Sequence, residues 1–150
     1  MDNELVYWNF FLDFGPLNLG QLYRFCAKLN YKLHKDKTLS HKHICFFSGA
    51  SENKRANAVF LICAYQVLYL NRKPEEALQM LKSQIKTLPP FHDASPGRCT
   101  YRLKVVDCIR GLVRAKKFGF FDFDKFDAQE YEHFEQVEVR LENMKLGVLF

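Results

Sequence analysis

The chain has 150 residues, of which 48% are hydrophobic and 15% aromatic, so it can bury the core of one ordinary domain, and a disordered or low-complexity protein is excluded. No apolar run approaches the roughly 20 residues that span a bilayer, and no secretory leader is visible, so we expect a protein that is neither membrane-bound nor exported. The five cysteines include no closely spaced pair, which argues against a disulfide framework and a zinc site and favours a reducing compartment.

Charge is distributed unevenly along the chain. The net charge is +5, but residues 122–138 contain seven acidic residues and one lysine and carry −6, so the remainder carries +11. A basic body could bind nucleic acid, whereas the acidic segment could bind cationic peptides. Charge alone does not choose between these partners.

The first third of the chain predicts an extended segment, a helix and a strand. Residues 4–12 are rich in aromatic and β-prone residues, which indicates a strand or extended segment, and residues 13–16 form a Gly-Pro turn. Asn18 can cap a helix over residues 19–33, where apolar residues recur at spacings of three and four. His43 to Phe47 then reads as a short buried strand.

Four more helices are expected after this strand. A central helix reaches to about Leu70, and Pro74 begins another whose inner face runs from Ala77 to Ile85. A Pro-rich loop over residues 88–97 separates these from a helix over about 100–117. Asp127 caps the last helix, whose predicted inward side chains are Tyr131, Phe134 and Leu141. We therefore predict a helix-rich α/β domain with a small central sheet flanked by about five helices.

The loop after the predicted strand has the outline of a cysteine-phosphatase site. Such a site needs a thiolate to attack phosphorus, N–H groups at a helix N-terminus to bind the phosphate, and an arginine fork to hold two of its oxygens. In that signature the cysteine precedes the arginine by six positions, but six positions before Arg55 stands Gly49, and Cys45 lies ten positions before it. We predict no catalytic residue, a core position for Cys45, and a vestigial phosphate loop formed by Gly49, Ser51, Asn53 and Arg55.

The sequence leaves two interpretations of Arg55 open. It could retain weak anion binding at the helix N-terminus, or it could form a surface salt bridge or cap local structure. Glu52 would place a negative charge within the loop and oppose a phosphate dianion.

Many short motifs, in order along the chain, resemble one family, the Cdc-fourteen-type dual-specificity protein phosphatases. They are Glu4-Leu5 with Tyr7 and Asn9-Phe10, residues 13–19 (DFGPLNL), 54–58 (KRANA), 74–77 (PEEA), Pro90-Phe91 with residues 93–95 (DAS), Asp107-Cys108, 119–123 (GFFDF) and 130–135 (EYEHFE). The match covers nearly the whole chain to about Glu138 and is to the N-terminal domain of that family.

The resemblance implies a specific division of labour. Members have two tandem domains of phosphatase fold, and the N-terminal one lacks the nucleophile while the C-terminal one holds the catalytic Cys and Arg. The N-terminal domain and the helix after it line an acidic groove that favours phosphoserine-proline sites followed by a basic residue. The carboxylates that match this role are Asp127, Glu130, Glu132, Glu135 and Glu138.

The same resemblance implies the cellular setting. It predicts a role in cell-cycle control in the nucleus and cytoplasm, with the nucleolus, centrosome or spindle as further sites. The partners would be a phosphatase catalytic domain, normally in the same polypeptide, and phosphoprotein substrates. From the residues themselves we expect no cofactor, metal or membrane, and nucleic acid is disfavoured as a partner.

Three features depart from the family pattern. The chain starts downstream of the first expected strands, so we expect an incomplete sheet. The sequence diverges after Glu138, and we divide the chain into a phosphatase-like domain, 1–126, and an acidic linker-type helix with a divergent tail, 127–150. His92 stands where the family usually has Arg, which removes any role of that Arg here.

Two other functions stay open on the sequence alone. One is a basic nucleic-acid-binding module that uses a cluster of cations, Arg102, Arg110, Arg114, Lys116 and Lys117. No nucleic-acid-binding motif accompanies this charge. The other is a truncated fragment without independent function, whose unpaired sheet edge would promote association.

Overall fold

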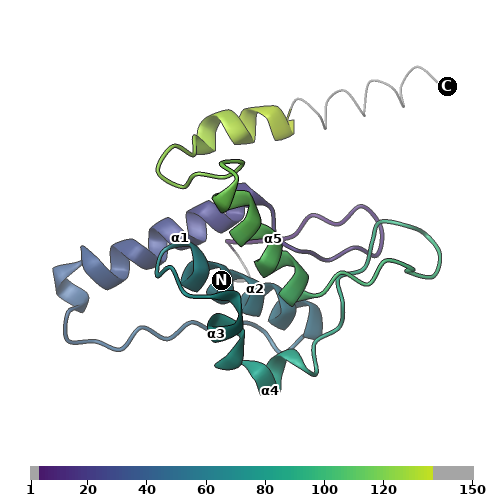
Figure 1. The fold of residues 1–150 in the computed structure, drawn as a ribbon, viewed down its shortest axis with the longest axis horizontal. Coiled ribbons are helices and arrows are strands. Elements are labelled where there is room, and N and C mark those ends of the chain that lie inside the picture. Colours follow the sequence, from purple (N-terminus) through teal and green to yellow (C-terminus); the bar gives the residue numbers. More distant parts are fainter. Residues whose placement is uncertain (1–3, 137–150) are drawn as a thin grey trace.

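The computed structural model describes residues 4–136, and Figure 1 shows helices gathered around α2. The elements are α1 (Leu19–His34), the short 3-10 helix η1 (Lys37–Leu39), α2 (Glu52–Leu68), α3 (Pro74–Gln79), α4 (Lys82–Ile85) and α5 (Val105–Lys117). Residues 128–136 form a further helical segment. Within residues 4–136, no helix combines the length and the apolar character that a membrane crossing requires.

Helix α2 is the centre of the fold, as its apolar sequence predicted. Residues 56–61 and 63–68 are all buried, and the helix packs against α1, α3 and α5. Leu61 and Cys63 are completely inaccessible to solvent. Burying a side chain such as Leu contributes roughly 1.5–3 kcal/mol, so this one helix supplies much of the apolar stabilisation.

Helix α1 begins where the sequence predicted. The Asn18 side-chain oxygen accepts a hydrogen bond from the backbone N–H of Gln21 at 2.8 Å, which satisfies one of the free donors at the helix start. Leu22, Phe25 and Cys26 are buried on its inner face.

The helix that was predicted to begin at Pro74 is two helices. Pro74 occupies the first turn of α3, and the Glu76 carboxylate accepts a hydrogen bond from the N–H of Lys73 at 3.3 Å. At Leu81 the backbone leaves the helical region, with ψ of 19°, and the chain starts α4 in a new direction. Ala77 is nevertheless buried, and Leu78, Leu81 and Ile85 pack against the core as predicted.

Helix α5 starts five residues later than predicted, at Val105. The Asp107 carboxylate accepts a hydrogen bond from Lys104 N–H at 3.0 Å and defines this start. Residues before it are drawn away because Leu103 forms an isolated antiparallel bridge with Phe91. Ile109 and Leu112 are buried, as the helical spacing indicated.

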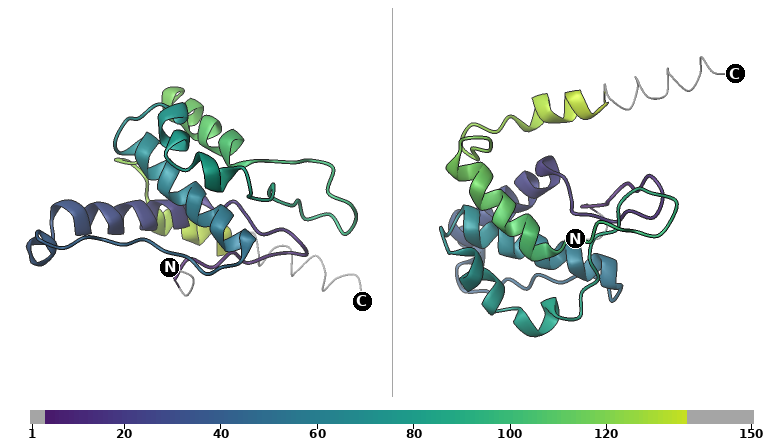
Figure 2. Two further views of the ribbon diagram at one scale, coloured as in Figure 1. Left: turned by 90° about the horizontal axis from the view of Figure 1, so that it is seen from below. Right: turned by 45° about the vertical axis from the view of Figure 1, so that its right-hand side comes forward.

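The small central sheet is not confirmed, because residues 4–136 contain no assigned strand. A strand needs a neighbouring strand to receive its hydrogen bonds. Figure 2 shows the chain between α1 and α2 as a long connection with no strand beside it, and residues 43–47 are not assigned as a strand. Only part of the segment is buried: Phe46 packs against Phe25 at 4.9 Å between ring centroids, whereas Phe47 is 77% exposed and Cys45 is exposed.

Candidate functional site

The predicted phosphate loop lies at the solvent-facing start of α2. Residues 48–51 form the loop, Glu52 begins the helix, and the N–H of Arg55 donates to the Ser51 carbonyl at 2.9 Å. The Ser51 hydroxyl makes no capping hydrogen bond. The structure therefore brings Gly49, Ser51, Asn53 and Arg55 to one helix N-terminus, with Ser51 and Asn53 exposed.

Arg55 is engaged within its own helix. Its guanidinium lies 3.8 Å from the Glu52 carboxylate one turn earlier, which is the salt-bridge alternative that the sequence left open. Its Nε atom is buried and has no hydrogen-bond partner among the described residues. A phosphate at this loop would have to compete with the Glu52 carboxylate for the same cation.

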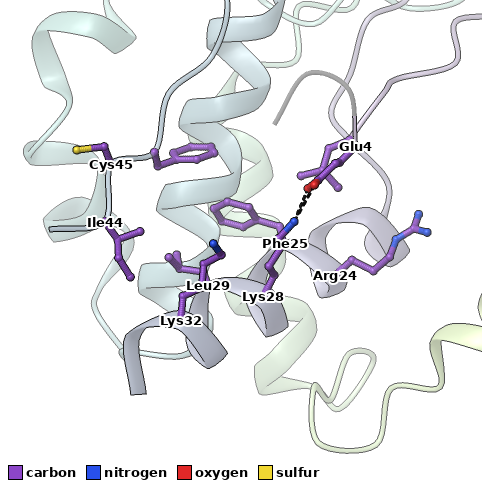
Figure 3. Close-up of a pocket in the computed structure, with 10 residues that line it drawn as sticks. Glu4, Arg24, Phe25, Lys28, Leu29, Lys32, Ile44 and Cys45 are labelled. Carbon is purple, nitrogen blue, oxygen red and sulfur yellow. Dashed lines mark hydrogen bonds and ion pairs between the residues drawn. The ribbon is translucent and has the colours of Figure 1, made fainter. Parts of the chain in front are cut away.

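None of the cysteines is placed as a nucleophile for this loop. The predicted core position of Cys45 is wrong. This residue is exposed at the rim of a groove of about 440 Å³ between α1 and residues 44–46. Figure 3 shows its sulfur pointing away from Phe25, while Lys28 forms an ion pair with Glu4 at 2.6 Å across the groove. Burial raises the pKa of the Cys63 thiol to about 11, which disfavours the reactive thiolate.

A cavity of about 400 Å³ adjoins the loop. Asn53, Lys54 and Asn57 of α2 line one side, and the N-terminal segment over residues 5–14 lines the other. The Asn57 amide donates to the Phe14 carbonyl at 2.6 Å and so ties the N-terminal segment to α2. The sequence pattern did not predict this contact of Asn57.

The N-terminal segment is held in shape by the buried carboxylate of Asp13, which sequence reasoning treated only as part of a turn. It accepts hydrogen bonds from the Tyr7 hydroxyl at 2.7 Å and from the N–H groups of Phe10 and Phe11 at 2.9 and 2.8 Å. Burial by itself would raise the pKa of Asp13, but the hydrogen bonds outweigh it and lower the pKa. Burial, with the bond to Asp13, raises the pKa of Tyr7 to about 12.

The Asp13 carboxylate should make the fold sensitive to acid. Because its pKa is lower in the folded than in the unfolded chain, the stabilisation is complete above the unfolded value, near 3.8, and is lost as pH falls through the folded pKa. Asp13→Asn should lower the free energy of unfolding at pH 7 by about 1–3 kcal/mol and flatten its dependence below about pH 4. Urea unfolding at several pH values measures both effects.

Asp122→Asn is the matched control for this prediction. Asp122 is a surface residue whose carboxylate lies 3.5 Å from Lys125 one turn along the chain, and exposed pairs of this kind contribute little. If Asp122→Asn lowers stability as much as Asp13→Asn, the buried hydrogen bonds do not account for the effect.

The second predicted site is the acidic helical segment, and its carboxylates have different partners. Asp127 caps the segment, accepting hydrogen bonds from the N–H groups of Gln129 and Glu130 at 2.9 and 3.0 Å. Glu132 forms an ion pair with Arg24 at 2.8 Å, and Glu135 accepts a hydrogen bond from Asn18 at 2.6 Å. Glu130 is exposed, and Glu138 lies outside the described residues. Glu132 and Glu135 therefore contact α1 and its N-cap residue.

Aromatic contacts fix the segment in this position. The Tyr131 ring packs against Phe126 at 5.4 Å between centroids and lies 2.9 Å from the point that a Cβ on Gly20 would occupy. Contacts through residues 131, 132 and 135 place the opposite side of the helix in solvent. This explains why Phe134, predicted to face the body, is 60% exposed, while Leu141 lies outside the described residues.

The basic cluster on and around α5 is partly occupied by contacts within the chain. The Lys116 ammonium donates to the Leu68 carbonyl and the Asn71 side chain, both at 2.8 Å. The Arg110 guanidinium lies 3.6 Å from Glu75. These contacts leave less of the cluster available to phosphates than the sequence suggested.

Comparison with known proteins confirms the resemblance that the motifs indicated. Residues 1–115 match the family described as dual specificity protein phosphatase, N-terminal half. The chain is 53% identical over 139 residues to dual specificity protein phosphatase CDC14A of Mus musculus, covering 92% of this chain and 23% of the relative. It is 35% identical over 138 residues to tyrosine-protein phosphatase CDC14 of Saccharomyces cerevisiae, covering 92% of this chain and 25% of that relative. The chain thus spans about a quarter of the length of these proteins.

Proposed function

Because the chain belongs to the family of N-terminal halves of dual-specificity protein phosphatases, we propose that it is a non-catalytic unit that supports a phosphatase catalytic domain. The observation that carries this proposal is the loop before α2, where a helix N-terminus and Arg55 are present but no thiol lies six residues before the arginine. The carboxylate that faces Arg55 is that of Glu52, in the same helix.

Two features support contact with a second domain of the same polypeptide. The relatives extend well beyond the matched region. The N-terminal segment also carries large apolar side chains at the surface, including Trp8, 87% exposed, with Phe10, Phe11 and Leu12 nearby. Several exposed apolar side chains so close together in the sequence favour an interaction site.

We further propose that the unit selects proline-directed phosphosites followed by basic residues, in cell-cycle control in the nucleus and cytoplasm. The acidic segment supports this choice, since carboxylates favour a cationic peptide by charge complementarity. Glu130 is the strongest candidate, because it is exposed while Glu132 and Glu135 bind α1.

The chain alone should not hydrolyse p-nitrophenyl phosphate, because the loop before Arg55, residues 48–54, contains no thiol. Release of p-nitrophenolate should stay at the buffer rate, and Cys45→Ser should change nothing. Turnover that Cys45→Ser abolishes would show that the chain carries its own nucleophile and would contradict the proposal.

Substrate selection can be tested in a chimera in which this chain replaces the segment that it matches in the mouse relative. We expect hydrolysis of a phosphoserine-proline peptide with a following lysine to exceed that of a peptide with glutamate in its place. Glu130→Gln should lower kcat/KM for the lysine peptide up to about fivefold, the range of one exposed charge pair, and leave the glutamate peptide unaffected.

Glu75→Gln is the matched control for the chimera, because Glu75 is an exposed carboxylate on α3, paired with Arg110. It should leave the peptide preference unchanged. An inactive chimera would argue against the supporting role, and equal effects of the two substitutions would argue against selection by the acidic segment.

A further inference from the structure

The long connection between α4 and α5 brings together three side chains that can ligate a metal ion. One ligand atom from each of His92, Asp93 and Cys99 lies within 4.8 Å of the others, and all three residues are half-buried. The loop projects at one side of the helices in Figure 1. None of these residues belongs to the phosphate loop or the acidic segment.

The fold, rather than chance proximity on a flexible loop, sets this arrangement. Phe91 is buried, and its N–H donates to the Leu103 carbonyl at 2.7 Å, which closes the loop at its base. The residues just after Phe91 must therefore face those that precede Leu103. This is how His92 and Asp93 meet Cys99 across the loop.

The spacing of the donor atoms suits a tetrahedral ion. Cys99 Sγ lies 3.6 Å from Asp93 Oδ2, and a ring nitrogen of His92 lies within 4.8 Å of the other two ligand atoms. With zinc–ligand bonds of about 2.0–2.3 Å, the ligands of a tetrahedral site lie about 3.3–3.7 Å apart. The Cys99–Asp93 distance falls within this range, and the distances to the His92 nitrogen, at most 4.8 Å, would have to shorten on binding.

The donor set selects the class of metal. One imidazole nitrogen, one carboxylate oxygen and one thiolate suit zinc, whereas Mg²⁺ and Ca²⁺ prefer oxygen ligands throughout. The Asp93 Oδ1 atom accepts hydrogen bonds from the N–H and the hydroxyl of Ser95, which leaves Oδ2, 3.6 Å from Cys99 Sγ, as the oxygen that can bind the metal. Binding would require Cys99 to lose its proton to solvent.

We propose that His92, Asp93 and Cys99 form a zinc-binding site with an open fourth position for water. The cysteine spacing gave no sign of this site, because only one cysteine takes part and the other two ligands come from across the loop. The site is independent of the phosphatase-related function proposed above, so either can fail without the other.

Titration of the full 150-residue chain with Co²⁺, a spectroscopic substitute for zinc, tests the proposal. We expect a thiolate-to-metal absorption band in the near ultraviolet that saturates at one Co²⁺ per chain and disappears on addition of Zn²⁺. Cys99→Ser should remove the band, and His92→Asn should weaken Co²⁺ affinity at least about tenfold. Circular dichroism checks that each variant is folded.

Matched substitutions outside the loop control for adventitious binding. Cys45→Ser and His43→Asn remove an exposed thiol and an exposed imidazole elsewhere and should leave the Co²⁺ spectrum and affinity unchanged. The proposal is overturned if the wild-type chain gives no band in excess Co²⁺, if Cys99→Ser keeps the band, or if Cys45→Ser removes it.

Discussion

Replacing Phe91 by Ala should lower the free energy of unfolding by about 3–5 kcal/mol, the range for deleting a buried aromatic ring. The ring is 2% exposed and packs against Phe14 at 5.5 Å between centroids. Its surroundings come from separate parts of the chain, so the cavity cannot close by a single local shift. Urea unfolding followed by circular dichroism measures the change, with the slope checked for two-state behaviour.

Two further variants keep this prediction testable if Phe91→Ala does not fold. Phe91→Leu leaves a smaller cavity and should therefore cost less than Phe91→Ala. Phe120→Ala removes a ring that is 84% exposed and should change stability by no more than about 0.5 kcal/mol. Equal losses at positions 91 and 120 would contradict the central role of the Phe91 ring.

Features that depend on neighbouring residues were predictable from the sequence. The apolar spacing identified α1 and the buried α2. The capping preferences of Asn18, Pro74 and Asp127 predicted three helix starts, and the structure confirms them. In each case the signal and the structure that it predicts lie within a few residues of each other. The absence of a thiol six positions before Arg55 could likewise be read by counting.

Features that depend on distant contacts were not predictable in the same way. Residues 43–47 have strand-like composition, but no described neighbour pairs with them, so Cys45 is exposed. Nothing in the local pattern of the acidic segment marks Glu132 as the partner of Arg24. The buried carboxylate of Asp13 and the cluster around Cys99 likewise exist only because the fold closes around them.

Gly15→Ala should lower the free energy of unfolding by about 3 kcal/mol, at the upper end of the usual cost of overpacking. A Cβ at this position would lie 2.4 Å from Asn57 Oδ1 and 2.7 Å from the nearest Phe91 ring carbon. Its φ lies outside the left-handed region, so the expected cost comes from the crowded space and not from backbone conformation. Urea unfolding of the variant at neutral pH measures it.

For Gly111, in α5, we expect substitution by Ala to change stability in the opposite direction. A Cβ on Gly111 would meet nothing within 4 Å, so Gly111→Ala should raise stability by about 0.5–1 kcal/mol through its effect on helix formation. A loss of stability at both glycines would show that the crowding at Gly15 is not what matters.

A double-mutant cycle separates the two contacts of the added methyl group. In the Phe91→Ala background the ring is gone, so Gly15→Ala should cost less than in the wild-type chain, with a coupling energy of about 1–3 kcal/mol. The remaining cost would report on Asn57, whose amide is held by its bond to the Phe14 carbonyl and has little freedom to move. Strict additivity would mean that the ring moves aside at no cost, and the Gly-Pro turn would then be less tightly packed against α2 than the distances imply.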